Sequence, residues 1–405
     1  MIIPKNSDFS IHNIPFGIFS IGKQKKRLAT IIGSQIVDLF ALAELGYFDD
    51  LKIKKSIFKN DFLNDFISLG KQKTNVVRLR LQEILSKSDA EKLDIFYAES
   101  EVKLHLPIKI GDYTDFYSSE SHATNVGTMF RDPANALLPN WKHIPVAYHG
   151  RASSIFVSGT NFHRPKGQIL PNGAEIPVFS PTKCLDIELE MATIIGKNNE
   201  IGDSVDVNKA EEYAFGFLLF NDWSARDIQK WEYVPLGPFL AKNFFSSVSP
   251  WVVTTEALAP FRVKSAPQTP IVLPYLDEIN RQNFDVNLEV YLTPKSQKSE
   301  VKISSSNFKN MYWSVAQQIA HHTVNGCNLN VGDVLASGTI SGKEADSFGS
   351  LLELTWGGKN PITLPDGSKR TFLEDGDTVS IKGFAEKNGV RVGFGELKTM
   401  ILPTK

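Results

Sequence analysis

Hydrophobic and polar positions follow different patterns on the two sides of residue 107. Residues 8–47 alternate apolar and polar side chains between turn signals, which predicts short strands. Residues 51–92 instead carry apolar side chains three and four positions apart among many charges, a spacing typical of amphipathic helices. A proline interrupts this pattern within residues 106–108. We therefore expect a small N-terminal domain over residues 1–107.

After residue 107 the chain consists of many short apolar runs separated by glycine, proline and asparagine. Such runs predict a domain rich in strands and long loops. Helical spacing is found in only two places, at 209–213 and at 312–324. The pattern therefore predicts a mainly β (α+β) protein, with a larger second domain over residues 108–405.

The stretch Leu185–Met191, L-D-I-E-L-E-M, reads as a strand with one apolar and one acidic face. The acidic face carries Asp186, Glu188 and Glu190. Neighbouring carboxylates repel each other and burial raises their pKa values, so a partly buried cluster of this kind requires a cation. Carboxylate oxygens favour Mg²⁺, Ca²⁺ or Mn²⁺ over zinc. On an open surface the same face would be solvated without a metal, and the stretch alone leaves both interpretations open.

The composition restricts the partners and the compartment. Hydrophobic residues make up 42% of the 405 positions, as in an ordinary folded protein. With 44 basic and 45 acidic residues, no overall charge attracts nucleic acid or an anionic membrane. The apolar runs are too short to span a membrane. Because the chain has only two cysteines and its N-terminus lacks a signal-peptide pattern, we expect a cytoplasmic protein with free thiols.

Polar segments with candidate chemistry lie on both sides of the acidic stretch. Residues 111–127 read as a polar loop that offers Asp115, Tyr117 and His122, and an acid, a phenol and an imidazole this close together favour a site over a surface histidine. Residues 141–155 offer Tyr148, and Arg131 precedes them.

A second group of candidates follows an apolar run that ends at Asp222, where a strand would end. Arg226 and Gln229 would share one face if the next turn is helical. Lys242 comes after a proline-rich aromatic loop. Arginine, glutamine and lysine together would be strong hydrogen-bond donors to an oxyanion. A salt-bridged interface loop would have the same spacing and is an equal alternative.

The last polar segment, residues 335–344, contains Thr339 in the turn G-T-I-S-G, and Glu353 follows in L-L-E-L. As a turn between strands it requires no function. Several other chemistries lack their motifs: there is no G-x-S-x-G, H-E-x-x-H, paired C-x-x-C, Walker A or Rossmann G-x-G-x-x-G.

Long strings of unusual composition fill these segments: G-D-Y-T-D-F-Y-S-S, S-H-A-T-N-V-G, H-G-R-A-S-S-I, L-D-I-E-L-E-M, N-D-W-S-A-R-D-I-Q, W-E-Y-V-P-L-G-P-F, S-P-W-V-V, N-G-C-N-L and A-S-G-T-I-S-G. In their content and order the chain resembles the fumarylacetoacetate hydrolase family. The resemblance runs from residue 111 to 396, and N-I-P-F-G-I-F-S extends it into the N-terminal part. It therefore goes beyond the broad superfamily, to the enzymes that complete tyrosine and phenylalanine catabolism.

The resemblance implies an SH3-like β-barrel with helical segments in residues 1–107 and a mixed β-sandwich roll in residues 108–405. It also implies a homodimer that hydrolyses the carbon–carbon bond of 4-fumarylacetoacetate, a small dianionic β-diketone, to fumarate and acetoacetate. One alternative is another β-diketone or acylpyruvate hydrolase, or a decarboxylase, of the same superfamily. A rival from a different class is a non-catalytic binding protein that a metal only stabilises.

Individual roles are implied by the same resemblance. A divalent metal, Ca²⁺ or Mg²⁺ with Mn²⁺ as a further candidate, would be bound by Asp115, Glu188, Glu190 and Asp222, a set that omits Asp186. The general base would be His122, paired with Glu353, and the oxyanion donors would be Arg226, Gln229 and Lys242. The substrate contacts would be Tyr117, Arg131, Tyr148, Gln229, Tyr233 and Thr339.

A second ion is implied near Lys242 and Ser246. Two dipeptides depart from the family pattern. Glu120-Ser121 precedes the histidine where a more basic or amide pair is expected, and Phe245-Ser246 stands where the family often has Gly-Thr. The second departure means that backbone carbonyls would have to bind that ion.

Overall fold

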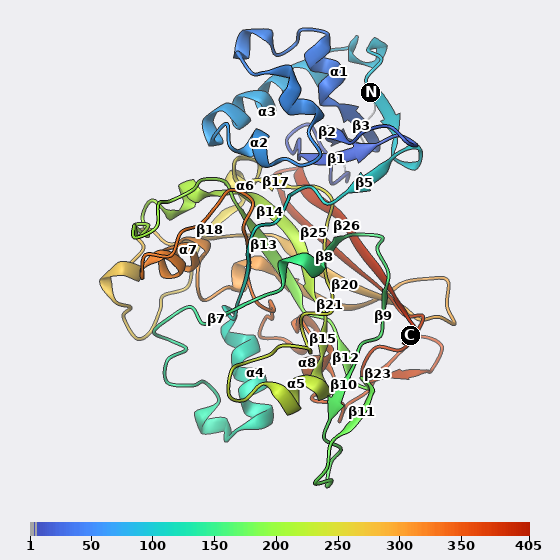
Figure 1. Ribbon diagram of the computed structural model, residues 1–405, viewed down its shortest axis with the longest axis vertical. Coiled ribbons are helices and arrows are strands. Elements are labelled where there is room, and N and C mark those ends of the chain that lie inside the picture. The colour runs from blue at the N-terminus through green and yellow to red at the C-terminus, as the bar shows by residue number, and fades with distance from the viewer. Residues whose placement is uncertain (1–3, 5) are drawn as a thin grey trace.

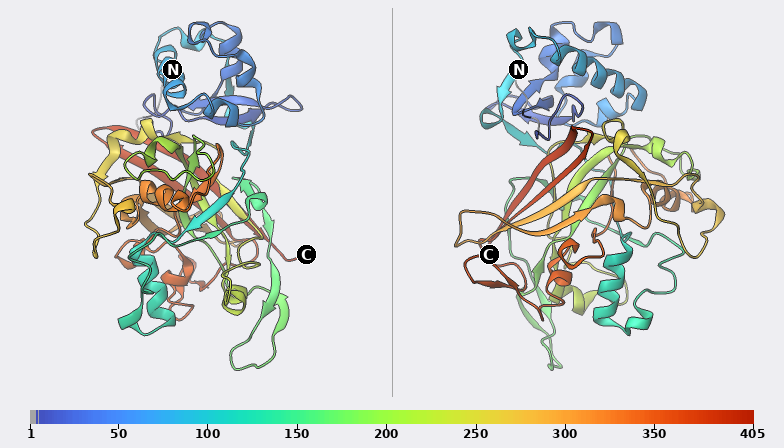
Figure 2. Two further views of the ribbon diagram at one scale, coloured as in Figure 1. Left: turned by 60° about the vertical axis from the view of Figure 1, so that its left-hand side comes forward. Right: turned by 180° about the vertical axis from the view of Figure 1, so that it is seen from behind.

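The computed structural model describes residue 4 and residues 6–405 as a smaller N-terminal part above a larger part made mainly of strands (Figures 1 and 2). The sheets are curled and the helices are few and short, so the expected mainly β class is confirmed. Among the described residues, no helix is both long and apolar enough to cross a membrane.

The N-terminal part is a five-stranded antiparallel sheet of order β4-β3-β2-β1-β5, with helices packed against it. Its strands are β1 (Gly17–Ser20), β2 (Arg27–Ile32), β3 (Gln35–Asp38), β4 (Phe96–Ala98) and β5 (Lys103–His105), and its helices are α1 (Leu39–Glu44), α2 (Asn64–Ile67) and α3 (Lys71–Leu85). The expected strands and helices are therefore present. Helix α1 was not expected within residues 8–47; it begins there because Asp38 accepts hydrogen bonds from the Phe40 and Ala41 amides at 3.0 and 3.1 Å.

Two larger sheets form the rest of the molecule. The eight-stranded sheet contains β6 (Tyr113–Phe116), β7 (Ala147–His149), β8 (Ile155–Val157), β13 (Leu189–Ile195), β14 (Ala214–Asp222), β16 (Ser246–Val248), β17 (Val253–Thr254) and β22 (Val334–Ala336). The five-stranded sheet contains β9 (Phe162–His163), β20 (Asn287–Thr293), β21 (Val301–Asn307), β25 (Thr378–Lys387) and β26 (Val390–Leu402).

Short ladders and helices complete this part. The two-stranded ladders pair β10 (Lys166–Ile169) with β11 (Val178–Pro181), β12 (Leu185–Asp186) with β15 (Ser224–Ala225), β18 (Arg262–Lys264) with β19 (Gln282–Phe284), and β23 (Ile362–Thr363) with β24 (Lys369–Arg370). The helices are α4 (Glu120–Phe130), α5 (Arg226–Glu232), α6 (Thr255–Leu258), α7 (Val315–Thr323) and α8 (Leu351–Leu354).

Both faces of the central strands β13 and β14 are covered, which places their ends deep in the molecule. In β13, Ala192 and Ile194 belong to an apolar core shared with the N-terminal part. Leu189 and Met191, on the opposite face, pack in a second core with residues of the five-stranded sheet. Coverage of both faces explains why these strands read as nearly continuous apolar runs.

Three expected elements differ from those observed. Residues 185–191 form two strands, β12 and β13, because Leu185 and Asp186 pair with β15 whereas Leu189 pairs with β14. Residues 111–127 are not a loop: they form β6 and the first two turns of α4. The segment 209–213 is a 3₁₀ turn over Ala210–Tyr213, while the expected helix at 312–324 is confirmed as α7.

Candidate active site and metal centre

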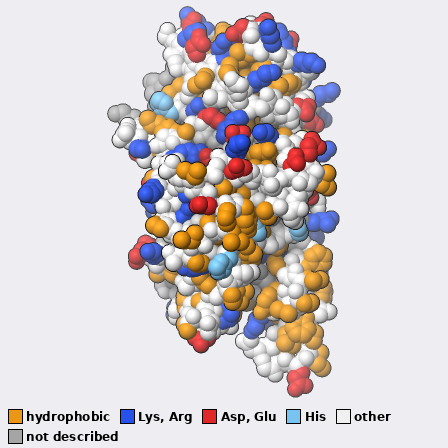
Figure 3. Space-filling view, turned by 90° about the vertical axis from the view of Figure 1, so that its left-hand side faces the viewer, with side chains coloured by type: hydrophobic (Ala, Val, Ile, Leu, Met, Phe, Trp, Pro, Cys, Tyr) orange, Lys and Arg blue, Asp and Glu red, His pale blue; other side chains and the backbone are white. Residues whose placement is uncertain are grey.

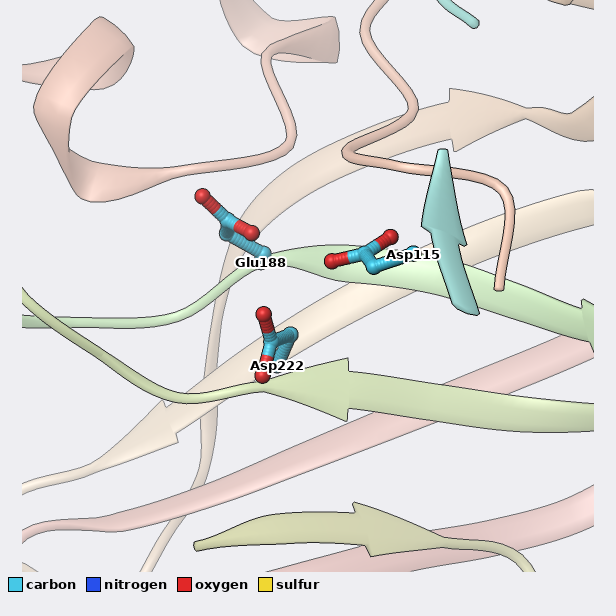
Figure 4. A group of neighbouring side chains, drawn as sticks. All are labelled: Asp115, Glu188 and Asp222. Atoms are coloured by element: carbon cyan, nitrogen blue, oxygen red, sulfur yellow. The ribbon is translucent and has the colours of Figure 1, made fainter. Parts of the chain in front are cut away.

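Three buried carboxylates from separate strands meet at one point (Figure 4). Asp115 belongs to β6, Glu188 directly precedes β13, and Asp222 ends β14. One oxygen of each lies within 4.8 Å of the others. The sheet register fixes their surroundings, since Asp115 lies opposite Tyr148 of β7 and Asp222 lies opposite Ser246 of β16. The structure thus brings together three of the four predicted metal ligands.

The fourth predicted ligand, Glu190, lies two residues further along β13 and outside this group of three. Its Oε2 accepts a hydrogen bond from the Gly338 amide at 3.0 Å. Its Oε1 is buried without a hydrogen-bond partner, as is Oδ1 of Asp115, within residue 4 and residues 6–405. Because a buried carboxylate oxygen is costly to leave unpaired, both atoms fit ligands of a cation.

Two side-chain cations neutralise part of the cluster. Lys242 Nζ lies 2.5 Å from Glu188 Oε2 and 2.8 Å from Asp222 Oδ2. Arg226 Nη1 lies 2.7 Å from Glu188 Oε1. Four carboxylates against two cations leave at least two uncompensated negative charges, which a divalent cation would balance.

The pKa values of the acids are shifted in opposite directions, depending on whether a side-chain cation contacts them. Burial, followed by repulsion from the neighbouring carboxylates, raises the pKa values of Asp115 and Glu190 well above the usual range. Burial would also raise the pKa of Glu188, but Lys242 and Arg226 outweigh it and lower that pKa to about 2. The acids without a cationic partner are therefore those that gain most from a metal.

Asp222 also receives two hydroxyl groups. Tyr148 donates to Oδ2 at 2.6 Å, and Ser246 donates to Oδ1 at 2.9 Å. The Lys242 ammonium has hydrogens but no lone pair, so its Nζ cannot bind a second ion. The predicted second ion would therefore need oxygen ligands other than Lys242, such as backbone carbonyls or the Ser246 hydroxyl oxygen.

His122 and Glu353 form a second buried pair, carried by the helices α4 and α8. His122 lies in the first turn of α4, whose N-cap is Ser119, and Glu353 lies in α8. His122 Nδ1 is 2.7 Å from Glu353 Oε2. A carboxylate on Nδ1 fixes the tautomer that carries its proton there, so the lone pair is on Nε2. This is the state that a general base requires.

Glu353 receives further hydrogen bonds that the sequence did not reveal. Ser341 and Ser350 donate to Oε2 at 2.9 and 2.8 Å, and Asn125 donates to Oε1 at 2.9 Å. Burial would raise the pKa of Glu353, but the interaction with His122 and the hydrogen bonds from Asn125 and Ser350 outweigh it and lower that pKa. Two of the donors had a local signal: Ser350 and Glu353 have the S-x-x-E spacing of a helix start, and Asn125 is three residues after His122.

The predicted oxyanion donors lie together beside the acids. Arg226 and Gln229 do share a face of α5, and Arg226 Nη1 donates to Gln229 Oε1 at 3.2 Å. The second terminal nitrogen of Arg226, Nη2, is buried without a partner within the described residues. Thr339 Oγ1 is in the same situation. Both groups are therefore available to a bound molecule.

The other predicted substrate contacts are less closely gathered. The ring of Tyr117 meets the ring of His122 edge-on, with centroids 5.2 Å apart. Arg131 caps the end of α4 and donates through Nη2 to the Ala136 carbonyl at 2.6 Å. Tyr233, at the end of α5, is 53% exposed. Their roles as substrate contacts stay predictions.

Two family models together match most of the chain. Residues 12–107 match the model described as "Fumarylacetoacetase N-terminal", and residues 112–401 match "Fumarylacetoacetate (FAA) hydrolase C-terminal". The chain belongs to the fumarylacetoacetate hydrolase family. A fumarylacetoacetase of Homo sapiens is 50% identical over 409 residues, covering 99% of this chain and 98% of the relative. One of Arabidopsis thaliana is 49% identical over 411 residues, covering 99% and 97%.

The fold is also similar to solved structures. A fumarylacetoacetate hydrolase of the psychrophile Exiguobacterium antarcticum superposes with a TM-score of 0.53 at 17% identity, covering 96% of this chain and 99% of that one. A maleylpyruvate hydrolase of Sphingobium gives a TM-score of 0.51 at 15% identity, covering 96% and 100%. At these identities the likeness extends to the fold alone.

Proposed function

We propose that the chain hydrolyses the carbon–carbon bond of 4-fumarylacetoacetate, releasing fumarate and acetoacetate. The observation that carries the proposal is the buried His122–Glu353 pair beside an acidic cluster with uncompensated charge. The activity named for relatives 49–50% identical over 99% of the chain supports the same reaction.

A divalent metal fits the cluster, and Asp115, Glu188, Glu190 and Asp222 are the residues that would hold it. Ca²⁺ and Mg²⁺ are the preferred candidates, with Mn²⁺ next, since all the ligands are hard oxygens. When bound, the ion would polarise the diketone oxygens and orient the substrate. The unpaired oxygens of Asp115 and Glu190 support this assignment.

His122 is the proposed general base. Its Nε2 takes a proton from water, and the water oxygen adds to the ketone carbon of the fumaryl group, which becomes the new carboxyl carbon of fumarate. Glu353 holds the ring and stabilises the positive charge that develops on it. Because three further donors keep Glu353 ionised, this stabilisation persists over the pH range in which the enzyme would work.

The proposed oxyanion donors are Arg226, Gln229 and Lys242. They stabilise the negative charge that develops on the former carbonyl oxygen, and losing one such donor commonly costs about 3 kcal/mol of transition-state stabilisation. When the oxygen re-forms its double bond, the carbon–carbon bond breaks and its electron pair leaves with the acetoacetate carbon. His122 then gives its proton to that carbon, which becomes the methyl group of acetoacetate.

The substrate itself would be bound by Tyr117, Arg131, Tyr148, Tyr233 and Thr339, together with Gln229. A dianionic substrate carries a carboxylate at each end, which an arginine and phenolic hydroxyls suit. Within the described residues, Thr339 Oγ1 and Arg226 Nη2 have no hydrogen-bond partner, which supports a polar ligand in this space.

Product analysis tests the reaction. Purified protein given 4-fumarylacetoacetate should yield fumarate and acetoacetate in equal amounts, with loss of the diketone absorbance. An acylpyruvate offered at the same concentration should be cleaved much more slowly. Cleavage of the acylpyruvate alone would favour the broader superfamily activity, and no cleavage of either would favour a non-catalytic protein.

We also propose a homodimer. The β10–β11 hairpin projects from the body and exposes Ile176, Val178 and Phe179, with Phe179 72% exposed (Figures 1 and 3). Helix α5 packs against this hairpin, and the loop after it exposes further apolar side chains such as Leu236 and Phe239. Neighbouring exposed apolar groups of this kind typically bind another protein surface.

Three further assignments stay proposals. The curled N-terminal sheet supports an SH3-like barrel over residues 1–107, with the catalytic domain over residues 108–405. Two unpaired cysteines support a reducing, cytoplasmic location. A second ion near Lys242 and Ser246 would need backbone carbonyls or the Ser246 hydroxyl oxygen, because Lys242 Nζ is a donor and offers no lone pair.

A further inference from the structure

Asp186 is the acid of the Leu185–Met191 stretch that does not join the metal cluster. It is fully buried in β12, and the break between β12 and β13 separates it from Glu188. Its Oδ1 accepts from the Ile187 and Leu351 amides at 2.8 and 2.7 Å. Its Oδ2 accepts from the Leu352 amide at 3.0 Å and from Arg226 Nε at 2.8 Å. Every contact of this carboxylate is therefore a donor from the protein.

These donors connect Asp186 to two groups of the site: the His122–Glu353 pair and the acidic cluster. Leu351 and Leu352 begin α8, and the next residue, Glu353, holds His122. Arg226 begins α5 and reaches Glu188 of the acidic cluster with its Nη1. One carboxylate thus joins the helix that orients the base to the arginine assigned to the oxyanion.

We propose that Asp186 is a positioning residue, which sets the distance between the His122–Glu353 pair and the Arg226 guanidinium. The inference rests on the proposed function, because both groups act in that reaction. An ionised carboxylate accepts hydrogen bonds at both oxygens. An asparagine in its place has one accepting oxygen and one donating nitrogen. Depending on its orientation, either the Ile187 and Leu351 amides or the Leu352 amide and Arg226 lose their acceptor, so one α8 amide loses its bond in both cases.

The loss of these hydrogen bonds in Asp186→Asn would lower kcat rather than weaken the binding of substrate or metal. Arg226 and His122 would each keep their own chemistry, but their relative placement would change, and a displacement of about 1 Å can cost on the order of 10²-fold in rate. Within the described residues neither oxygen of Asp186 contacts a proposed metal ligand, and Lys242 still pairs with Glu188 and Asp222 if Arg226 shifts, so metal affinity should be preserved.

A matched control is available at Asp377. It is likewise fully buried, and it accepts from Arg370 Nε and Nη2 at 3.1 and 3.2 Å and from the Glu374 amide at 2.9 Å. These contacts include no member of the acidic cluster or of the His122–Glu353 pair. Asp377→Asn therefore removes a buried aspartate–arginine pair without changing the site.

The test compares wild type, Asp186→Asn and Asp377→Asn at saturating metal and below the unfolding temperature. We expect kcat of Asp186→Asn to fall about 10- to 100-fold, with KM and metal affinity within threefold of wild type. Asp377→Asn should unfold at a lower temperature but keep its kcat. An unchanged kcat in folded Asp186→Asn, or an equal loss in the control, would overturn the proposal.

A second variant covers the case in which Asp186→Asn does not fold. Asp186→Glu keeps the charge but moves the carboxylate by one methylene, so kcat should again fall at least tenfold with metal bound. Failure of both variants to fold, beside a folded Asp377→Asn control, would assign Asp186 a purely structural role. Absence of cleavage by wild type would instead refute the proposed function, and this inference with it.

Discussion

His122 is the residue on which the proposed chemistry depends, and it can be removed without touching the acids. It makes no hydrogen bond to Asp115, Glu188 or Asp222 within the described residues. His122→Phe should therefore lower kcat by about 10²–10⁴-fold, the usual contribution of a general base. Metal titration should give an unchanged affinity. Activity within tenfold of wild type would contradict the assignment of His122 as the base.

The lowered pKa of Glu353 leads to a prediction of how the stability of the protein depends on pH. Its pKa is lowered in the folded state, against the effect of burial, by His122 and its hydrogen-bond donors. The unfolded chain therefore binds this proton more readily, and the stabilisation is present above about pH 4.3 and is lost as the pH falls through the folded-state pKa.

Denaturant unfolding of wild type and Glu353→Gln checks this dependence. The variant should be less stable by about 2 kcal/mol at pH 7, because buried donors lose a charged acceptor. The difference should shrink below about pH 4. A difference that grows on acidification would show that Glu353 is not ionised in the folded protein.

At single positions, the sequence predicted the acids better than their partners. Asp222 was found because it follows an apolar run, and Asp115 because it shares a polar segment with a phenol and an imidazole; the structure places Asp222 at the end of β14 and Asp115 within β6. Of the donors to Glu353, Ser350 lies three residues away in the sequence, whereas only the tertiary structure brings Asn125 and Ser341 to it. The role of Asp186 could not be read from a period of two, because the strand breaks directly after it.

The turn after β22 connects two parts of the site and depends on a glycine. Gly338 has φ +75° and donates its amide to Glu190, and Thr339 follows it. A Cβ at Gly338 would lie 2.2 Å from the Phe116 carbonyl oxygen, so a side chain is excluded both by the backbone conformation and by the contact. The turn thus brings the β22 end against β6, which carries Asp115.

Gly338→Ala should lower the free energy of unfolding by about 3 kcal/mol or more and weaken metal binding. Gly389→Ala is the matched control, because Gly389 has φ +76° and no described atom would lie within 4 Å of a Cβ added there. The left-handed conformation alone should cost the control about 1 kcal/mol, with unchanged activity. Equal losses in both variants, measured by denaturant unfolding, would contradict a role for the close contact.

Whole elements were predicted where local pattern and tertiary context agree. The helix at 312–324 has a regular apolar stripe and was confirmed. Helix α4 was missed because residues 120–130 are small and polar, with a short apolar stripe, and its N-cap, Ser119, lies among other serines. Such a composition does not distinguish a loop from a helix. In the folded protein, hydrogen bonds from His122 and Asn125 to Glu353 hold α4 against α8.

The hairpin β10–β11 predicts the assembly of the whole molecule. Phe179→Glu would place a charge in the apolar surface of the hairpin, so the variant should sediment as a monomer while wild type sediments as a dimer. Ile201→Glu, at another exposed apolar position, should stay dimeric. Analytical ultracentrifugation measures the oligomeric state of each variant. A monomeric wild type or a dimeric Phe179→Glu variant would exclude this interface.

The whole molecule joins three layers at one site: the N-terminal part covers one face of the central sheet, and the five-stranded sheet covers the other. The acids, the base pair and the arginine all lie at strand ends or on the short helices around that central sheet. Removal of the metal should therefore affect stability as well as activity, because four buried carboxylates would repel each other.

Cleavage of 4-fumarylacetoacetate, with and without a chelator, is the decisive measurement. The protein should convert the substrate to fumarate and acetoacetate. Chelation should remove roughly 99% or more of this activity, on the order of the contribution of a catalytic metal, and restoring Ca²⁺ or Mg²⁺ should recover it. Undiminished cleavage in the chelator, with metal analysis showing that the ion has been removed, would contradict a metal-dependent reaction at this site.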